Sequence, residues 1–261
     1  MQTTLPISLK SAAIQILEWF GEFGIFCSRM FQAGLSSKYQ IKELIRQMDE
    51  VGSKSLPVVA LAGAAIGVVM SMQLRDSLIR FGAKSMLPAV IILSILKETA
   101  PIITALVVSG RVAAGIGAEL GSMKVTEQID ALEASAVDPF RFLVITRVVA
   151  CVLMIPLLTL FAACFGILAG WFANNLVEPL SIRLFLVDGF KQVEYSDFLA
   201  PVLKTCVFGF IVGAIGCFQG MKAKGGAEGV GRYTTSAVVL SALFVILADV
   251  VLVRLLIILC D

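Results

Sequence analysis

Two adjacent ionisable residues, Lys97 and Glu98, lie within an apolar run over residues 86–109. The run is long enough to cross a bilayer, whose hydrocarbon core of ~30 Å takes about 20 helical residues. An unpaired charge at the centre of a membrane costs about 2.5–3.5 kcal/mol or more. Because adjacent helical side chains point about 100° apart, Lys97 and Glu98 cannot fully neutralise each other. We therefore predict that their partners come from other helices.

The candidate partners are charged residues in two later apolar runs, namely Lys204, Asp249 and Arg254. One interpretation is a buried network of ion pairs that fixes the packing of the helices. The other is a polar floor to a substrate cavity, in which the same charges would face the substrate. The two roles are compatible, and both stay open.

A second set of residues could contact an acyl chain. Its members are spaced i, i+4, i+8 and i+11, so they share one face of a helix that begins in the first apolar run. They are Met70, Leu74, Leu78 and Phe81. Flexible methionine and aromatic side chains suit a variable apolar ligand. The alternative is an ordinary surface for helix packing.

A third set lies in residues 118–138, where charged and apolar residues interleave at helical spacing. This pattern predicts a short amphipathic helix between two membrane spans, on which a soluble motor protein could push. The candidate contact residues are Glu119, Met123, Lys124, Glu127 and Gln128. The alternative is a solvated connecting helix with no partner.

Signatures of enzyme active sites are missing from the sequence. The glycine-rich residues 220–236 do not form the G-x-x-x-x-G-K-[ST] loop that holds nucleotide phosphates, and no G-x-S-x-G motif is present. The chain has no histidine, and we interpret its six cysteines as small buried hydrophobic residues. We therefore expect no catalytic residue, no metal site, no cofactor and no ATP hydrolysis by this chain alone.

The elements that position these residues are predicted to be membrane helices. Of the 261 residues, 58% are hydrophobic and 15% are charged, whereas soluble domains are about 45–50% apolar and about 25% charged. The apolar runs of spanning length are residues 56–74, 86–109, 148–172, 201–219 and 237–259. The sequence therefore predicts an all-α integral membrane protein with five transmembrane helices.

The N-terminal segment is predicted to stay outside the bilayer core. Residues 11–33 combine aromatic side chains with Glu18, Glu22 and Arg29, which favours an interfacial helix over a sixth span. Residues 39–51 have the pattern of a short amphipathic helix. We therefore divide the chain into an N-terminal cytoplasmic or interfacial segment, residues 1–54, and a transmembrane domain, residues 55–261.

The segments between the spans differ in charge and composition. Most Lys and Arg residues outside the apolar runs fall on the side of the N-terminus, so the positive-inside rule predicts a cytoplasmic N-terminus and an external C-terminus. Residues 173–200 are predicted to form short helices on the outer side, and residues 220–236 a glycine-rich inner loop.

Pairs of glycines at G-x-x-x-G spacing recur in the apolar runs and predict close helix contacts, within the chain or across a dimer. They are Gly63/Gly67, Gly166/Gly170, Gly209/Gly213 and Gly216/Gly220.

The segment KETAPIITALVVSGRVAAGIGAELGSMKVTEQIDALEASAVDPFRFL resembles the central signature of the MlaE family of ABC-transporter permeases. The later segments FGFIVGAIGCFQGMKAKGGAEGVGRYTTSAVV and ADVVL resemble its second signature. The resemblance runs from about residue 40 to the C-terminus. One departure is visible: where the family usually reads Glu-Leu/Phe-Gly-Pro, this chain reads Glu98-Thr99-Ala100-Pro101.

The resemblance implies a homodimer of permease subunits in the bacterial inner membrane, with an interfacial helix, five spans and a periplasmic C-terminus. ATP and Mg²⁺ would be bound by a separate cytoplasmic ATPase, which residues 118–134 would contact as a coupling helix. An MCE-domain protein would bind on the outer side. The implied substrate is phospholipid, moved between the inner membrane and the outer envelope, and no nucleic acid is involved.

The resemblance also assigns positions to the candidate residues. Lys97, Glu98, Lys204 and Asp249 fall where the family carries charges near its lipid cavity. The set Met70, Leu74, Leu78 and Phe81 falls on its lipid-facing first helix.

Two other functions stay open on the residues alone. An ion- or proton-coupled secondary transporter could use the buried charges as a relay, although five spans without an evident inverted repeat argue against it. A structural scaffold of an envelope assembly would use the same charges only to hold helices together.

Overall fold

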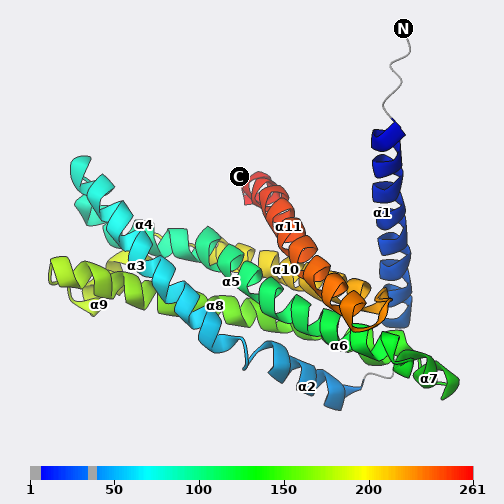
Figure 1. Ribbon diagram of the computed structural model, residues 1–261. Coiled ribbons are helices and arrows are strands. Elements are labelled where there is room, and N and C mark those ends of the chain that lie inside the picture. The colour runs from blue at the N-terminus through cyan, green and yellow to red at the C-terminus, as the bar shows by residue number, and fades with distance from the viewer. Residues whose placement is uncertain (1–6, 35–39, 261) are drawn as a thin grey trace, which may run out of the picture.

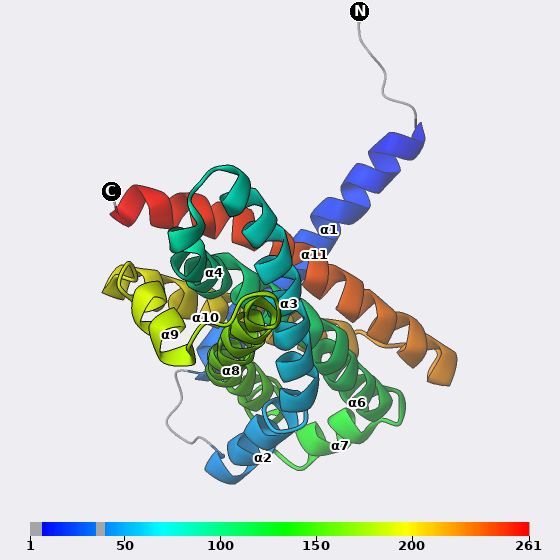
Figure 2. The same cartoon turned by 90° about the vertical axis from the view of Figure 1, so that its left-hand side faces the viewer.

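The computed structural model describes residues 7–34 and 40–260, in which every regular element is a helix. Within these residues, five helical stretches are long and apolar enough to cross a membrane: Ile41–Arg80, Lys84–Val125, Phe140–Val177, Tyr195–Met221 and Gly226–Leu256. The chain is therefore an all-α integral membrane protein, as predicted. The spans form a bundle in which α8 lies between α3 and α10 (Figures 1 and 2).

Two helices precede α3 (Leu56–Arg80), and the second of them, α2 (Ile41–Val51), belongs with α3 to the first spanning stretch. The helix α1 (Ile7–Gly34) runs crosswise to the long helices at one end of the bundle (Figure 1). Its aromatic residues anchor it there, because Trp19 stacks on Phe244 with ring centroids 5.6 Å apart. The helix α2 packs against α8. The boundary at residue 54 and the interfacial position of α1 stay predictions.

The second span is continuous from Lys84 to Val125, which is longer than the apolar run indicated. It contains η1 (Lys84–Met86), α4 (Leu87–Ser94), η2 (Ile95–Thr99), α5 (Ala100–Val108), η3 (Ser109–Ala113) and α6 (Ala114–Val125). Both η2 and η3 are π-helical turns, which are rare and are concentrated at functional sites. Lys97 and Glu98 lie in η2, in the first half of the span rather than at its centre.

The predicted amphipathic helix over residues 118–134 is divided in two. Its first part is the end of α6, and its second part is α7 (Gln128–Ala134). Between them, Glu127 has a φ of 58°, a left-handed conformation that a continuous right-handed helix cannot contain. An ion pair of 2.8 Å between Lys124 and Asp130 crosses this corner.

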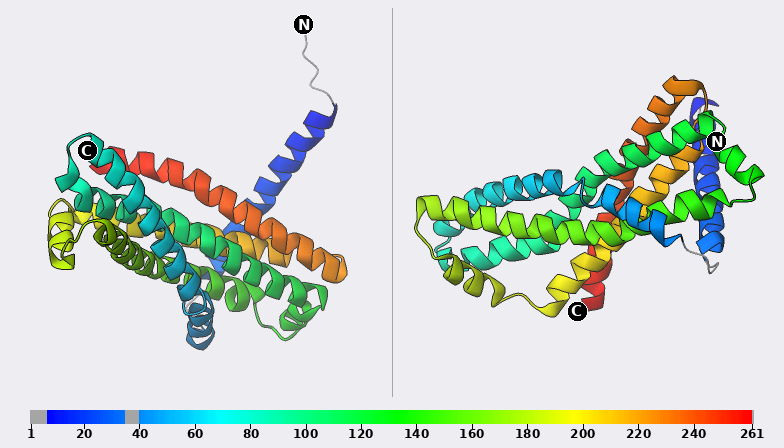
Figure 3. Two further views of the ribbon diagram at one scale, coloured as in Figure 1. Left: turned by 60° about the vertical axis from the view of Figure 1, so that its left-hand side comes forward. Right: turned by 90° about the horizontal axis from the view of Figure 1, so that it is seen from below.

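The third span begins with the π-helical turn η4 (Phe140–Ile145) and continues as α8 (Thr146–Val177). It is followed by α9 (Ile182–Phe190), which packs against α4 and agrees with the short helices predicted for this segment. The fourth span, α10 (Tyr195–Met221), starts with a capping box between Glu194 and Asp197. The α9 end of the bundle lies opposite α7 (Figures 1 and 3).

The loop predicted over residues 220–236 is much shorter, because α11 (Gly226–Cys260) already begins at Gly226. Gly225 and Gly226 have φ values of 89° and 68°, so they form the turn that a residue with a side chain would resist. Ala223 lies in this turn, whereas Ala227, Gly229 and Gly231 belong to the first turns of α11. This stretch packs closely, since a Cβ on Gly121 of α6 would contact Ala223 and Val230.

The four glycine pairs pack within the chain. On α3, a Cβ added to Gly63 or Gly67 would overlap the backbone of Ala162 or Gly166 on α8. On α10, Gly209 and Gly213 face the backbone of α8, and Gly216 and Gly220 face α6. The backbones of α3, α8, α10 and α6 therefore approach one another directly, which sets the spacing of the bundle.

Candidate functional site

Five charged side chains from three spans form two groups of ion pairs, Lys97 with Asp197, and Lys204 with Glu98 and Asp249; together we call them the interhelical charge cluster. Lys204 Nζ donates a hydrogen bond of 2.7 Å to Glu98 Oε2. The same Nζ lies 2.8 Å from Asp249 Oδ1, and Lys97 Nζ lies 2.5 Å from Asp197 Oδ1. The cluster ties η2 to α10 and to α11.

The spacing on each helix explains this arrangement. Asp197 and Lys204 are seven residues, or about two turns, apart, so both lie on the face of α10 that meets η2. Lys97 and Glu98 point in different directions and reach different partners. Asp197 was missed by the sequence reasoning, although its seven-residue spacing from Lys204 was a usable signal.

Lys204 is the buried member of this cluster. Its side chain is 1% exposed, whereas that of Glu98 is 51% exposed. An ammonium group removed from water needs close carboxylates to remain charged, and Lys204 has two. Arg254, the third candidate partner, is exposed and forms no ion pair within the described part of the chain. The role of the cluster in substrate binding stays a prediction.

The residues proposed to contact an acyl chain lie along the second half of α3 and just beyond it. Met70, Leu74 and Leu78 are half-buried, and the last two pack against the hydrophobic core. Phe81 follows the last residue of α3 and is exposed. The proposed lipid contact stays a prediction.

A polar clamp joins the same end of α3 to the end of α8. Arg75 Nη1 donates a 2.8 Å hydrogen bond to Asn174 Oδ1, and Arg75 Nη2 lies 3.2 Å from Glu178 Oε2. Lys84 Nζ donates to Glu178 Oε1 at 2.6 Å. The hydrogen bond from Lys84, helped by Arg75, holds the pKa of Glu178 below its ordinary value. This clamp was not identified from the sequence.

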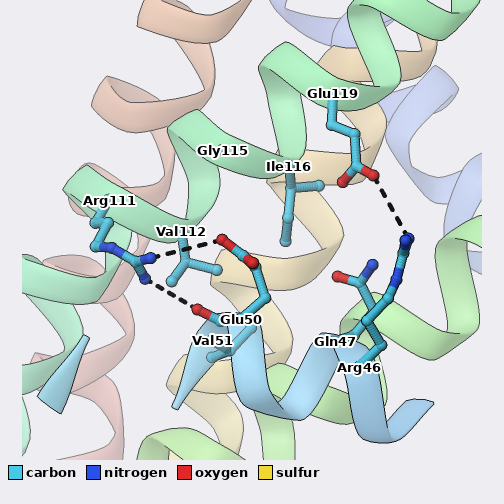
Figure 4. Close-up of a pocket in the computed structure, with 9 residues that line it drawn as sticks. All are labelled: Arg46, Gln47, Glu50, Val51, Arg111, Val112, Gly115, Ile116 and Glu119. Atoms are coloured by element: carbon cyan, nitrogen blue, oxygen red, sulfur yellow. Dashed lines mark hydrogen bonds and ion pairs between the residues drawn. The ribbon is translucent and has the colours of Figure 1, made fainter. Parts of the chain in front are cut away.

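At the α6 end of the bundle, a cleft of about 390 Å³ separates α2 from η3 and α6 (Figure 4). It is lined by charged residues and by small or apolar ones: Arg46, Gln47, Glu50, Val51, Arg111, Val112, Gly115, Ile116 and Glu119. Two ion pairs cross it. Arg111 Nη2 lies 3.7 Å from Glu50 Oε1, and Arg46 Nη2 lies 3.9 Å from Glu119 Oε1.

Glu119 also reaches a third helix. Its Oε2 lies 2.8 Å from Nη2 of Arg147, whose side chain is 1% exposed. Arg147 Nη1 donates to the carbonyl oxygen of Leu143 in η4 at 2.8 Å. Arg147 was not identified from the sequence, although its position directly before the third apolar run was a usable signal.

The remaining residues proposed to contact a motor protein differ in their exposure. Met123 is half-buried and packs against the core, and Lys124 pairs with Asp130. Glu127 and Gln128 are exposed at the corner between α6 and α7. The structure therefore leaves Glu127, Gln128 and the outer face of α7 accessible, while Glu119 is engaged inside the chain.

Comparisons with known proteins give a consistent result. A family model described as "Permease MlaE" matches residues 44–255. A probable ABC transporter permease protein of Rickettsia felis is 34% identical over 98% of this chain and 98% of its own length. A probable ABC transporter permease protein of Synechocystis sp. is 36% identical over 82% of each chain. The chloroplastic protein TRIGALACTOSYLDIACYLGLYCEROL 1 of Arabidopsis thaliana is 34% identical over 96% of this chain and 71% of its own.

Proposed function

The chain belongs to the MlaE permease family, and we propose that it is the subunit of an ABC transporter that moves phospholipids between the bacterial inner membrane and the outer envelope. The observation that carries this proposal is the extent of the family match, residues 44–255, which contains the charge cluster and the corner between α6 and α7. The name of the Arabidopsis relative, which is formed from that of a glycolipid, supports a lipid substrate.

In the proposed mechanism the energy comes from a separate cytoplasmic ATPase, which binds ATP and Mg²⁺ and contacts α7 and the corner at Glu127. An MCE-domain protein on the periplasmic side exchanges lipid with the permease. The N-terminus is cytoplasmic and the C-terminus periplasmic. The charge distribution of the sequence and the family match support these assignments.

A homodimer is the proposed assembly. The apolar stretch of α11 is the least covered of the five spans, with 17% of its residues buried against 33–50% in the other four. Its exposed side chains include Val239, Leu243, Ile246 and Val250. An apolar face of this length needs a cover of lipid or protein, and a second copy of this chain would supply part of it.

The test is reconstitution in liposomes with a candidate ATPase and a candidate MCE-domain protein from the same organism. The proposal expects ATP-dependent transfer of a fluorescent phospholipid that requires all three proteins, and no ATP hydrolysis by this chain alone. Transfer driven by a proton or ion gradient without the ATPase would instead identify a secondary transporter. Assembly without any lipid transfer would identify a scaffold.

A further inference from the structure

The α6–α7 corner is joined to the third span across a gap rather than by direct packing. α6 packs mainly against α10 and α11, where Gly117 and Gly121 bring it close to the first turns of α11. α2 packs against α8, and the cleft in Figure 4 separates α2 from α6. α6 is therefore connected to α8 by packing mainly through α10, which contacts both helices, and it faces α2 across the cleft.

Glu119 crosses this gap in two directions. One carboxylate oxygen lies 2.8 Å from Arg147 on α8, and the other lies 3.9 Å from Arg46 on α2. Glu119 is itself 43% exposed, so solvent competes for its carboxylate, whereas Arg147 is fully buried. The buried guanidinium of Arg147, rather than the partly exposed carboxylate of Glu119, therefore determines the strength of this ion pair.

Arg147 depends on this single carboxylate. Its Nη1 is satisfied by the carbonyl oxygen of Leu143, and its Nε is buried without a hydrogen-bond partner. Among the ion pairs of the described residues, Glu119 is the one acidic partner of Arg147. Removing one member of a buried pair leaves an uncompensated charge, which is strongly unfavourable, so the guanidinium holds Glu119 in place.

Two contacts hold α7 at the end of α6, since the Lys124–Asp130 ion pair spans the corner and Ile129 of α7 is buried. α7 therefore moves together with α6. We propose that Glu119 is a positioning residue that fixes α6 and α7 to α8 and α2, so that a displacement of α7 is delivered to the first and third spans. This role rests on the proposed function only for the ATPase that would displace α7. The contacts of Glu119 with Arg147 and Arg46 do not depend on that function.

The geometry is tested on this chain alone in lipid nanodiscs, by amide hydrogen exchange of residues 126–135. Glu119→Gln should exchange several-fold faster there than the unaltered chain. The matched control is Glu18→Gln, which removes an exposed glutamate that forms no ion pair among the described residues, and it should leave exchange unchanged. Equal exchange in all three proteins would overturn the proposal.

A second variant separates positioning from simple loss of stability. Glu119→Gln combined with Arg147→Gln removes the buried charge together with its partner. It should recover most of the thermal stability that Glu119→Gln loses, while exchange of residues 126–135 stays fast. If exchange slows again along with the recovery of stability, the unpaired charge alone explains the effect and the positioning role is wrong.

The consequence for transport is tested in liposomes with the ATPase and the MCE-domain protein. Glu119→Gln should keep the ATPase bound and should lower the amount of phospholipid moved per ATP hydrolysed several-fold, and Glu18→Gln should not. Loss of ATPase binding in Glu119→Gln would make Glu119 a contact residue and overturn the inference. If the unaltered chain binds no ATPase, the proposed function fails, whereas the exchange measurement still decides the positioning role.

Discussion

Glu98 and Lys204 lie 106 positions apart in the sequence, and their side chains meet at 2.7 Å. Lys204 also lies 2.8 Å from Asp249, so one buried ammonium group joins the second, fourth and fifth spans. Five charges among apolar helices are tolerated because each has an oppositely charged neighbour. The pairing makes Lys204 the member whose removal affects the largest number of helices.

Lys204→Met should therefore destabilise the protein by about 3 kcal/mol, since it leaves Asp249 without a partner and only Glu98 has access to solvent. The measurement is the midpoint of thermal unfolding in detergent micelles. Lys191→Met is the control, because Lys191, just after the end of α9, is exposed and has Asp188 as its one ion-pair partner among the described residues. Its effect should stay within about 0.5 kcal/mol. Equal midpoints for the two variants would show that the cluster adds no stability.

Gly67→Ala should weaken the contact between α3 and α8, because the new methyl group would overlap the backbone at Gly166. The expected loss is about 1–3 kcal/mol, as for other overpacked sites. Gly115→Ala provides the control, since a Cβ there meets nothing within 4 Å. Alanine is the better helix former, so this variant should be neutral or more stable by up to about 1 kcal/mol. A stable Gly67→Ala protein would contradict the close backbone contact.

Glu127→Gly should stabilise the corner between α6 and α7 by about 1 kcal/mol, because glycine adopts a φ of 58° without the strain that a side chain brings. Glu133→Gly, in the regular part of α7, should instead cost about 1 kcal/mol. The measurement is the midpoint of thermal unfolding of each variant, compared with that of the unaltered chain. A loss of stability in Glu127→Gly would mean that residue 127 is not left-handed in the membrane.

The polar clamp predicts a dependence of stability on pH. The bonds from Lys84 and Arg75 lower the pKa of Glu178 in the folded state from an ordinary value of 4.5. A carboxyl with a depressed folded pKa contributes stability that is fully present above the ordinary value and is lost as the pH falls through the folded value. The difference in unfolding midpoint between the unaltered chain and Glu178→Gln should thus be constant near neutral pH and shrink below pH 4.5.

The control for this prediction is Asp76→Asn, which changes an exposed carboxylate near the same end of α3 that forms no ion pair among the described residues. The difference in unfolding midpoint between Asp76→Asn and the unaltered chain should not shrink in the same way below pH 4.5. A Glu178→Gln difference that grows on acidification would contradict the sign of the shift.

The five spans were predictable because each contains a long and mostly apolar run, and hydropathy reports burial in lipid directly. The glycine pairs were predictable for a similar reason, since close backbone contact requires the absence of a side chain. The partners Lys204 and Asp249 could be proposed because charges are rare within the spans. In each of these cases one local property of the sequence corresponds to one structural requirement.

Other features depend on tertiary contacts that leave no local signal. The division at Glu127 requires a left-handed residue that is not glycine, which composition does not indicate. The helix at the start of α11 was predicted to be a loop because glycines disfavour isolated helices, but packing against α6 outweighs that propensity. Asp197 and Arg147 lie at the edges of apolar runs, where a charge is ordinarily solvated, so their pairing appears only in the assembled bundle.

The two π-helical turns of the second span determine where this span can lose a residue. A π-helical turn contains one residue more than an α-helical turn. Deleting one residue from η2 would therefore let the chain close into an ordinary α-helix and would leave the helix after it in nearly the same orientation. Deleting one residue from a regular part such as α5 would instead turn everything after it by about 100°. Arg111 would then point away from Glu50, and Gly117 away from Ala237. The π-helical turns are therefore the places where this span can lose a residue and still present its later side chains to the same neighbours.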